Sequence, residues 1–433
     1  MVHQTISTKI KPAAKASSKI HHMLLSSPVS ARTLSLFDRA APKALLWSCL
    51  ALLVACATPP LPAPSDTAPS LPSTAPVPAP APPRSSPPPA PSSQQIDVPP
   101  PEALGRDVRR SRWVAVAWEE LPGWNQESMA EAWNVLLANC DRPGATMAPL
   151  CPDIRRLSIA TEIEQREWLM QRMQAHRLEN WEGDPNGLLT GYYEPIFEAQ
   201  RQASEVFATP LYAAPPGIRA GQAWFTRQEI DTLPAAQNAL KGRVIAWLAD
   251  PVDALILQIQ GSGRLRITEP DGQVRTVRLS YAASNEQPYQ SVGRWLLDKG
   301  EVKDASWPGI KAWMQRNPQR VQSLLWVNTR YVFFKEEALP DPSVGPRGAQ
   351  GLPLTTGRSI AVDPQSIPYG TPLWLVSPGP TQALQRLVVA QDTGSAIVGA
   401  VRADLFMGTG MQAGELAGRM KQSLRMWVLW PRP

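Results

Sequence analysis

The pattern of hydrophobic and polar positions changes several times along this chain of 433 residues. After Arg112, apolar residues recur at three- and four-residue spacing in two stretches, which predicts helices over 126–140 and 161–180. Thr161 followed by Glu164 predicts a capping box at the start of the second helix. The same spacing predicts further helices over 288–300, 307–326 and 411–423.

Short apolar or alternating runs lie between these helices and predict β-strands. The stretch ALILQIQGSGRLRI, residues 254–267, is predicted to be one strand, and Asp271-Gly272 after it is typical of a hairpin turn. The other predicted strands cover 188–197, 243–248, 273–280, 327–336, 372–376, 386–392 and 425–430. This mixture indicates a mainly β, α+β or β-barrel body with helices at its start and middle.

The chain before Arg112 follows a different pattern. Basic residues are scattered over the first 43 positions, and the apolar run Ala44–Ala55 then has 12 residues, whereas a membrane-spanning helix needs about 20. Such an arrangement is typical of a secretory signal. The run ends Leu-Val-Ala-Cys, which resembles a bacterial lipoprotein signal. Residues 1–56 are therefore predicted to be a signal peptide that ends at a lipidated Cys56. The alternatives are an ordinary signal or a buried helix.

The segment after the signal is dominated by Pro, Ala and Ser. Eighteen of the 47 prolines fall between Thr58 and Pro101, a composition that cannot bury enough apolar surface to fold. Residues 57–102 are predicted to form a disordered, semi-rigid tether. A lipid at one end and a long spacer suggest a catalytic body held away from a membrane; a Pro-rich ligand for a partner protein is the weaker alternative.

Charge and composition exclude some function classes. The net charge is +6 without a dense Lys/Arg block, so we expect no nucleic-acid partner. The chain has four His, three of them before residue 23, and we expect no metal site and no cofactor. Outside the signal only Cys140 and Cys151 remain, and an oxidising compartment favours a disulfide between them. Two unrelated buried thiols are the alternative.

The candidate chemistry centres on three aspartates near strand ends. Asp392 opens an Asp-Thr-Gly-Ser sequence of the kind that carries the acid of aspartic proteases, but such enzymes need two copies and the chain has one. A turn that binds nearby backbone N–H groups is the structural alternative for Asp392 and for Asp363. Asp404 lies between a strand-like stretch and a helix, where catalytic groups are often found.

Six sequence blocks provide a resemblance in the same order along the chain. They are GYYEP (191–195), QIQGSGRLRI (258–267), YAASNEQPYQSVGRWL (281–296), NTRYVFFKE (328–336), GAQGLPLTTGRSIAVDPQSIPYGTPLWL (348–375) and DTGSAIVGAVRADLFMG (392–408). Together they resemble the membrane-bound lytic murein transglycosylase A family, and the last two resemble its three-aspartate domain, about 348–433.

The resemblance implies a fold that the periodicity does not give. It implies a double-psi β-barrel catalytic domain built from residues 103–198 and 322–433. It also implies a smaller β domain, residues 199–321, inserted in the middle, with the sugar strand in the cleft between the two.

The resemblance also implies the reaction. The family cleaves the β-1,4 bond between N-acetylmuramic acid and N-acetylglucosamine in peptidoglycan as an exotransglycosylase, a carbon–oxygen lyase that leaves a 1,6-anhydro ring. Asp404 matches the catalytic acid and base, and Asp392 and Asp363 match the other two acids of the motif. A single carboxyl suffices because the C6 hydroxyl of the sugar is the nucleophile, and burial would keep that carboxyl protonated. A non-catalytic peptidoglycan-binding lipoprotein is the alternative function.

Substrate contacts are expected from polar or flexible positions in the resembling blocks, although turns and core packing explain the same residues. These candidates are Tyr192, Tyr193, Glu194, Gln258, Gln260, Gly261, Ser262 and Gly263. The expected partners are peptidoglycan glycan strands and, through the lipid, the outer membrane, with the body in the periplasm. Cell-wall synthesis or division proteins are candidate partners, and we expect a monomer.

Overall fold

The computed structural model describes residues 110–432. The predicted signal peptide, Cys56 and the tether lie outside the described residues. Within the described part, two separate sheets contain the β-strands, one of eight and one of six. No helix among residues 110–432 is both long and apolar enough to cross a membrane.

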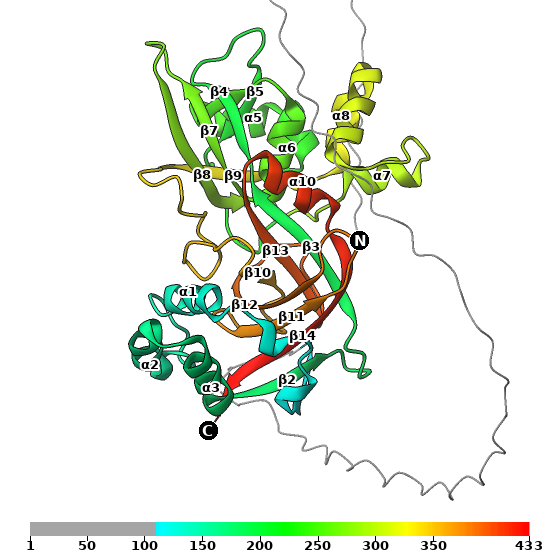
Figure 1. Ribbon diagram of the computed structural model, residues 1–433. Helices are drawn as coiled ribbons and strands as arrows, with labels where there is room; N and C mark the ends of the chain where they lie inside the picture. The colour runs from blue at the N-terminus through cyan, green and yellow to red at the C-terminus, as the bar shows by residue number, and fades with distance from the viewer. Residues whose placement is uncertain (1–109, 433) are drawn as a thin grey trace, which may run out of the picture. The chain divides into compact units, whose positions relative to one another are not determined.

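Six strands of the first sheet close into a barrel (Figure 1). Their order is β14-β11-β12-β10-β13-β3, and pairing of β14 with β3 completes the ring. The pairs β10–β12 and β13–β3 are parallel, whereas the other pairs of the ring are antiparallel. The strands are β3 (Gly187–Glu194), β10 (Ser359–Val362), β11 (Pro372–Ser377), β12 (Leu384–Asp392), β13 (Arg402–Thr409) and β14 (Lys421–Pro431).

Two further strands extend this sheet beyond the ring. β1 (Arg112–Val116) pairs with β2 (Met173–Glu179), and β2 pairs with the second half of β14. The first half of β14 pairs with β3, so this long strand serves both the barrel and its extension. Fully buried aliphatic side chains fill one core of this sheet, among them Leu189, Ile360, Leu373, Val388 and Leu405.

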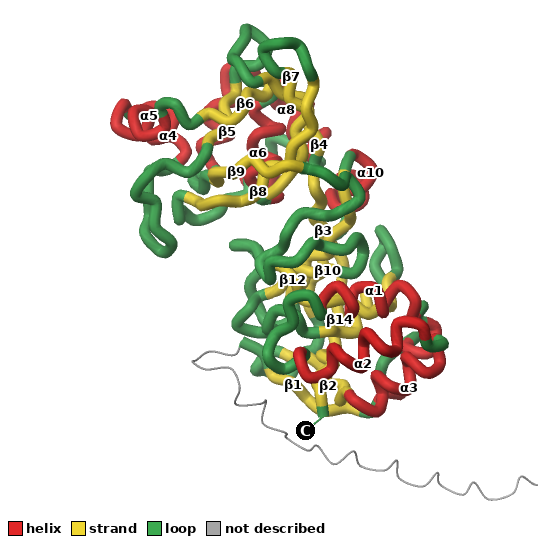
Figure 2. The backbone as a smooth tube through the Cα atoms, turned by 90° about the vertical axis from the view of Figure 1, so that its left-hand side faces the viewer, coloured by secondary structure: helices red, strands yellow, loops and turns green. Residues whose placement is uncertain are grey.

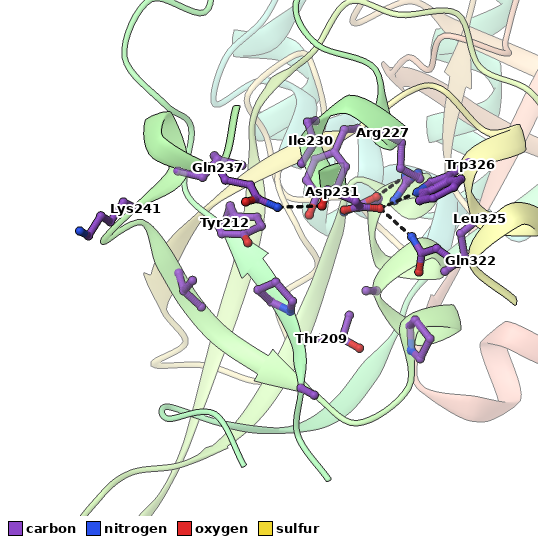
Figure 3. A pocket seen from close by; sticks show the side chains of 18 of the residues that line it. Thr209, Tyr212, Arg227, Ile230, Asp231, Gln237, Lys241, Gln322, Leu325 and Trp326 are labelled. Atoms are coloured by element: carbon purple, nitrogen blue, oxygen red, sulfur yellow. Dashed lines mark hydrogen bonds between the residues drawn. The ribbon is translucent and has the colours of Figure 1, made fainter. Parts of the chain in front are cut away.

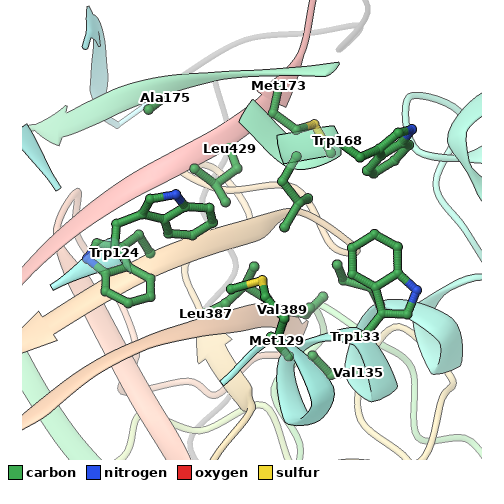
Figure 4. Close-up of a cluster of buried hydrophobic side chains, with 14 of the residues drawn as sticks. Trp124, Met129, Trp133, Val135, Trp168, Met173, Ala175, Leu387, Val389 and Leu429 are labelled. Atoms are coloured by element: carbon green, nitrogen blue, oxygen red, sulfur yellow. The ribbon is translucent and has the colours of Figure 1, made fainter. Parts of the chain in front are cut away.

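Three helices lie together beside the barrel in both views (Figures 1 and 2). They are α1 (Met129–Asn139), α2 (Cys151–Arg156) and α3 (Glu162–Arg172). A cluster of buried apolar side chains joins the helices to the barrel strands, in which Trp133 of α1, Trp168 of α3 and Trp124 before α1 pack with Leu387 and Leu429 (Figure 4). The structure contains a disulfide between Cys140, which follows α1, and Cys151, the first residue of α2.

The second sheet has the order β5-β6-β4-β7-β8-β9. Its strands are β4 (Ile196–Gln200), β5 (Thr209–Tyr212), β6 (Val244–Leu248), β7 (Ser262–Thr268), β8 (Val274–Ser284) and β9 (Val332–Ala338). The helices that follow one another between these strands are α4 (Arg227–Thr232), α5 (Pro234–Leu240), α6 (Pro251–Gln260), α7 (Val292–Asp298), α8 (Trp307–Arg316) and α9 (Val321–Val327). The sheet extends beyond residues 199–321 at both ends, so we propose that the inserted domain includes β4 and β9.

The predicted strand over 254–267 is wrong in its first half. Residues Pro251–Gln260 form helix α6, because the Asp250 side chain accepts a hydrogen bond from the Val252 N–H and Pro251 occupies the first turn. Gly261 ends the helix in the left-handed region at φ 77°, and β7 begins at Ser262. A short apolar run fits a buried helix as well as a strand, which explains the error.

Two predicted helices were too long. The predicted capping box of Thr161 and Glu164 is confirmed, but α3 ends at Arg172 and the chain then becomes strand β2. Similarly, α10 (Met411–Arg419) stops before β14 begins at Lys421. In both places, pairing with distant strands overrides the local helical pattern. The predicted helix over 307–326 is divided between α8 and α9 around Pro318.

Candidate active site

Four residues from four barrel strands form a row across the sheet. Ala361 of β10 is the register partner of Asp392 in β12 and of Asp404 in β13, and Asp404 is the partner of Thr190 in β3. Register partners on neighbouring strands project to the same face, so both carboxyl groups lie on one side of the barrel wall. The strand spacing separates their backbones by about 10 Å, and the small side chain of Ala361 leaves space between them.

A cavity of about 230 Å³ lies over this row. The barrel contributes Tyr192, Ala361, Asp392, Arg402 and Asp404 to its walls. The loop Thr393–Ile397 lines it as well. The opposite wall comes from the segment that carries the second sheet, through Gln258, Ile259, Gln260, Tyr289, Asn328, Arg330 and Val332. The two predicted acids Asp392 and Asp404 therefore lie in one cavity between the barrel and the inserted sheet.

Asp404 is half-buried and has one close hydrogen-bond donor. The Thr190 hydroxyl donates to its Oδ1 at 2.5 Å, and Arg402 Nη2 donates to the same hydroxyl oxygen at 2.8 Å. Burial raises the pKa of Asp404 to about 6, and the nearby Asp392 charge adds to the rise, whereas the Thr190 hydrogen bond and the Arg402 charge oppose it. A carboxyl with this pKa can hold a proton near neutral pH and also release it.

Asp392 has a different set of partners. The Tyr192 hydroxyl donates to its Oδ2 at 2.9 Å, and the Ala349 N–H donates to its Oδ1 at 2.9 Å. Burial raises the pKa of Asp392, and hydrogen bonds from the Thr393 N–H, the Ala349 N–H and the Tyr192 hydroxyl act in the opposite direction. The two acids thus differ in surroundings: both oxygens of Asp392 accept hydrogen bonds, whereas Asp404 receives the single hydroxyl of Thr190.

Asp363 does not line the cavity. Its side chain is 5% exposed and lies just beyond the end of β10. The N–H groups of Gln365 and Gly399 donate to its two oxygens at 3.0 and 2.9 Å, and Arg110 approaches at 3.3 Å. Asp363 therefore fixes the loop between β12 and β13. The first part of this loop contains the cavity residues 393–397.

Three of the predicted contact residues line the cavity: Tyr192, Gln258 and Gln260. Gln258 is buried in α6, where its Oε1 accepts a hydrogen bond from Arg227 at 2.5 Å. The Gln260 Oε1 accepts from the Tyr193 N–H at 3.0 Å and so joins α6 to barrel strand β3. Both glutamines were predicted on a strand, and their place on a helix end is a correction.

Glu194 is not available to a ligand. Its side chain is 0% exposed, and Arg278 Nε and Arg264 Nε donate to its two oxygens at 2.6 and 2.8 Å. The Thr409 hydroxyl is a further donor, at 2.9 Å. Because Arg264 and Arg278 belong to the second sheet, Glu194 connects that sheet to the barrel instead of binding substrate.

The remaining four candidates also lie outside the cavity walls. Tyr193 packs against α10, where a side chain at Gly414 would collide with its ring. Gly261 is the left-handed cap of α6. A Cβ at Gly263 would lie 2.2 Å from a methyl of Leu257, so close packing explains this glycine, and Ser262 is paired within the second sheet.

Several residues of the site were not predicted as site residues. They are the cavity-lining residues Tyr289, Asn328, Arg330 and Arg402, together with Thr190, which donates to Asp404 without lining the cavity. Arg402 lies two positions before Asp404 on the same strand, so a period-two pattern would have placed both on one face. Asn328 and Arg330 lie in a resembling block, but only the tertiary structure brings them opposite Asp404. Thr190 could be found only from the β3–β13 register.

Comparison with known proteins gives two domain matches. The MltA specific insert domain matches residues 188–335, and the 3D domain matches residues 358–430. A Vibrio cholerae protein named membrane-bound lytic murein transglycosylase A is 31% identical over 287 residues, which cover 61% of this chain and 73% of that protein. The chain belongs to the membrane-bound lytic murein transglycosylase A family. It is accordingly an enzyme of the lyase type.

Solved structures of this family agree with the fold. LtgG, a lytic transglycosylase of Burkholderia pseudomallei, is 42% identical, with 76% of this chain and 97% of that chain covered and a TM-score of 0.52. MltA from Neisseria gonorrhoeae is 29% identical, with 78% of this chain and 100% of that chain covered and a TM-score of 0.62. E. coli MltA with bound chitohexaose is 28% identical, with 70% of this chain and 90% of that chain covered and a TM-score of 0.58. The predicted fold class, a double-psi β-barrel with an inserted β domain, is confirmed.

Proposed function

We propose that this protein is a lytic peptidoglycan transglycosylase that cleaves the β-1,4 bond between N-acetylmuramic acid and N-acetylglucosamine. The observation that carries the proposal is Asp404: a carboxyl with a pKa of about 6, in a cavity between two sheets, beside a second carboxyl. Membership of the transglycosylase family and the glycan named with the E. coli neighbour support the substrate class.

In the proposed reaction Asp404 acts twice. Protonated Asp404 gives its proton to the glycosidic oxygen as the C1–O4 bond breaks, which releases the N-acetylglucosamine unit with a free 4-hydroxyl. The C6 hydroxyl of the same muramic acid attacks C1, and Asp404 takes the C6 hydroxyl proton. The enzyme is then back in its starting state and the product carries a 1,6-anhydro ring, so no water enters the balance.

Asp392 is proposed to support this step without exchanging a proton. Its oxygens accept hydrogen bonds from Tyr192 and Ala349, which favour the charged form, and a negative charge there would stabilise the positive charge that develops at C1. The same charge helps to raise the pKa of Asp404. Asp363 is proposed to hold the cavity loop through Gly399.

The test is mass spectrometry of purified peptidoglycan after digestion. We expect anhydro-muropeptides without reducing-end products. Asp404→Asn should lower their release by about 10²–10⁴-fold, because general acid–base catalysis contributes about that factor, while glycan binding remains. Reducing ends would instead identify a hydrolase. Glycan binding with no release by the unaltered protein would identify a non-catalytic binding module.

We also propose that the catalytic body is held in the periplasm by a lipid on Cys56 in the outer membrane. The signal-like sequence and the membrane-bound relatives support this location. Cys56→Ser should abolish incorporation of labelled palmitate and move the protein from the membrane fraction to the soluble fraction. A protein that stays in the outer-membrane fraction without label would contradict the lipid anchor.

A further inference from the structure

A second cavity lies within the segment that forms the six-stranded sheet (Figure 3). Its volume is about 640 Å³, within the range of about 300–1,000 Å³ typical of small-molecule sites. Its walls come from β5, β6 and helices α4, α5, α6 and α9. It contains neither Asp392 nor Asp404, and Gln258 is the one lining residue that it shares with the candidate active site.

Asp231 of α4 presents a carboxylate at this cavity with only one oxygen engaged. Trp326 Nε1 and Gln322 Nε2 both donate to Oδ2, at 2.8 and 2.7 Å, and Figure 3 shows the two side chains converging on Asp231. Gln237 donates to the Asp231 backbone oxygen at 2.7 Å. Among residues 110–432, no hydrogen bond reaches Oδ1. One carboxylate oxygen is therefore available to a ligand hydroxyl.

The charge of Asp231 is partly compensated. Arg227 is buried behind it, where it donates to the Asn328 carbonyl at 2.9 Å and to Gln258 Oε1 at 2.5 Å, and it lies 4.9 Å from the centre of the Tyr331 ring. Burial raises the pKa of Asp231, and the Arg227 charge opposes the rise. Because Arg227 offsets the carboxylate, the cavity favours a neutral polar ligand over a cation.

The other walls match a neutral ligand with one apolar face. Tyr212 and Trp326 are half-buried aromatic rings, which offer flat apolar surface together with a polar group. Gln237 and Gln322 are exposed amides that can both donate and accept hydrogen bonds. Aromatic surface beside a carboxylate and amides suits a pyranose ring that carries hydroxyls and an acetamido group.

We propose that this cavity is a second glycan site, which binds an N-acetylhexosamine unit away from the point of cleavage. The choice of this sugar rests on the proposed function, whereas the site itself is separate from it. A glycan strand repeats the same units many times, so one strand or two neighbouring strands can occupy both cavities. Occupancy of the second site would keep the enzyme on its polymer between cuts.

The test is isothermal titration calorimetry of the purified protein with tri-N-acetylchitotriose, which lacks the muramic acid needed for cleavage. We expect two sites in the unaltered protein. Trp326→Ala should remove one site or weaken it at least about tenfold. Asp231→Asn keeps an acceptor for Trp326 and Gln322 but lacks the charge, and should weaken the same site about tenfold. Trp295→Ala, a half-buried indole on α7, is the matched control and should keep both sites.

Three results would overturn the inference. The first is a single chitotriose site in the unaltered protein. The second is two chitotriose sites of unchanged affinity in the Asp231→Asn and Trp326→Ala proteins, whose folding is checked by circular dichroism. The third is Asp231-dependent binding of an Ala-Glu-Lys stem tripeptide without binding of chitotriose at that site. Anhydro-muropeptide release distinguishes this failure from failure of the proposed function, since release depends on Asp404 and the second site on Asp231.

Discussion

Thr190 and Asp404 face each other across the parallel pair β3–β13, and the Thr190 hydroxyl donates a 2.5 Å hydrogen bond to the Asp404 carboxyl. Arg402 donates to the same hydroxyl oxygen, so the threonine stands between a guanidinium and the proposed acid. This arrangement orients the carboxyl. It also opposes the rise in its pKa that burial causes.

Thr190→Val should therefore shift the pH dependence of turnover. Without the hydroxyl, the pKa of Asp404 rises above about 6, and the acid form that starts the reaction persists to higher pH. We expect the alkaline limb of kcat/KM to move up by about one pH unit, with a lower kcat because the carboxyl is less well oriented. The measurement is kcat/KM for peptidoglycan release from pH 4 to 9. Thr381→Val, on an exposed loop, is the control. If the alkaline limb of kcat/KM stays in place or moves to lower pH in Thr190→Val, the role of Thr190 is contradicted.

Asp404→Asn should stabilise the fold at alkaline pH. The folded-state pKa of about 6 exceeds the ordinary value of 3.8, so the unfolded chain ionises first as pH rises. Below pH 3.8 the Asp404 carboxyl is protonated in both the folded and the unfolded state, so it has no effect on stability. As the pH rises from there through about 6, the free energy of unfolding falls. The variant removes this loss, which is on the order of 1–3 kcal/mol at pH 8 and near zero at pH 3.5.

Urea unfolding at the two pH values measures this difference. Asp298→Asn, at the exposed end of α7, should change the free energy of unfolding little at either pH. Equal effects of Asp404→Asn at both pH values would show that the carboxyl is not held in a destabilised charged state.

Glu194→Gln should destabilise the protein strongly. Glu194 is 0% exposed and pairs with Arg264 and Arg278, whose side chains are 7% and 8% exposed. Removing the shared carboxylate leaves two buried guanidinium groups without their counter-charge, which costs about 3–5 kcal/mol. Thermal and urea unfolding measure the loss. As a control, Glu415→Gln breaks an exposed ion pair with Arg419 and should change the free energy of unfolding by less than about 0.5 kcal/mol. An equally small effect of Glu194→Gln would contradict the role of Glu194 in connecting the sheet to the barrel.

Loss of the Cys140–Cys151 disulfide should destabilise the helices α1 and α2. The bond closes a loop with a sequence separation of 11, for which chain entropy gives about 3 kcal/mol. The double variant Cys140→Ser/Cys151→Ser should lower the free energy of unfolding by about that amount in the absence of reductant. Dithiothreitol should lower the stability of the parent protein but not that of the variant; equal sensitivity of both would contradict the assignment.

The sequence alone was sufficient for the features that depend on local pattern or on matched motifs. The capping box at Thr161 needs only two residues three positions apart, and the three aspartates were found as motif positions. The fold class followed from the order of the six resembling blocks and not from periodicity. In contrast, the run 254–267 was misassigned, since a helix buried on most sides lacks the polar face that distinguishes it from a strand.

The tertiary structure decided which of these residues share a site. Pairing of two strands that lie more than 200 residues apart in the sequence brings Thr190 next to Asp404. The fold also places Asp363 outside the cavity that contains the other two acids. It also buries Glu194 between two arginines that the linear sequence places about 70 and 84 residues away. A sequence specifies which groups can ionise or donate hydrogen bonds. Burial, register and neighbouring charge set their pKa and accessibility, and these arise only when distant strands pair.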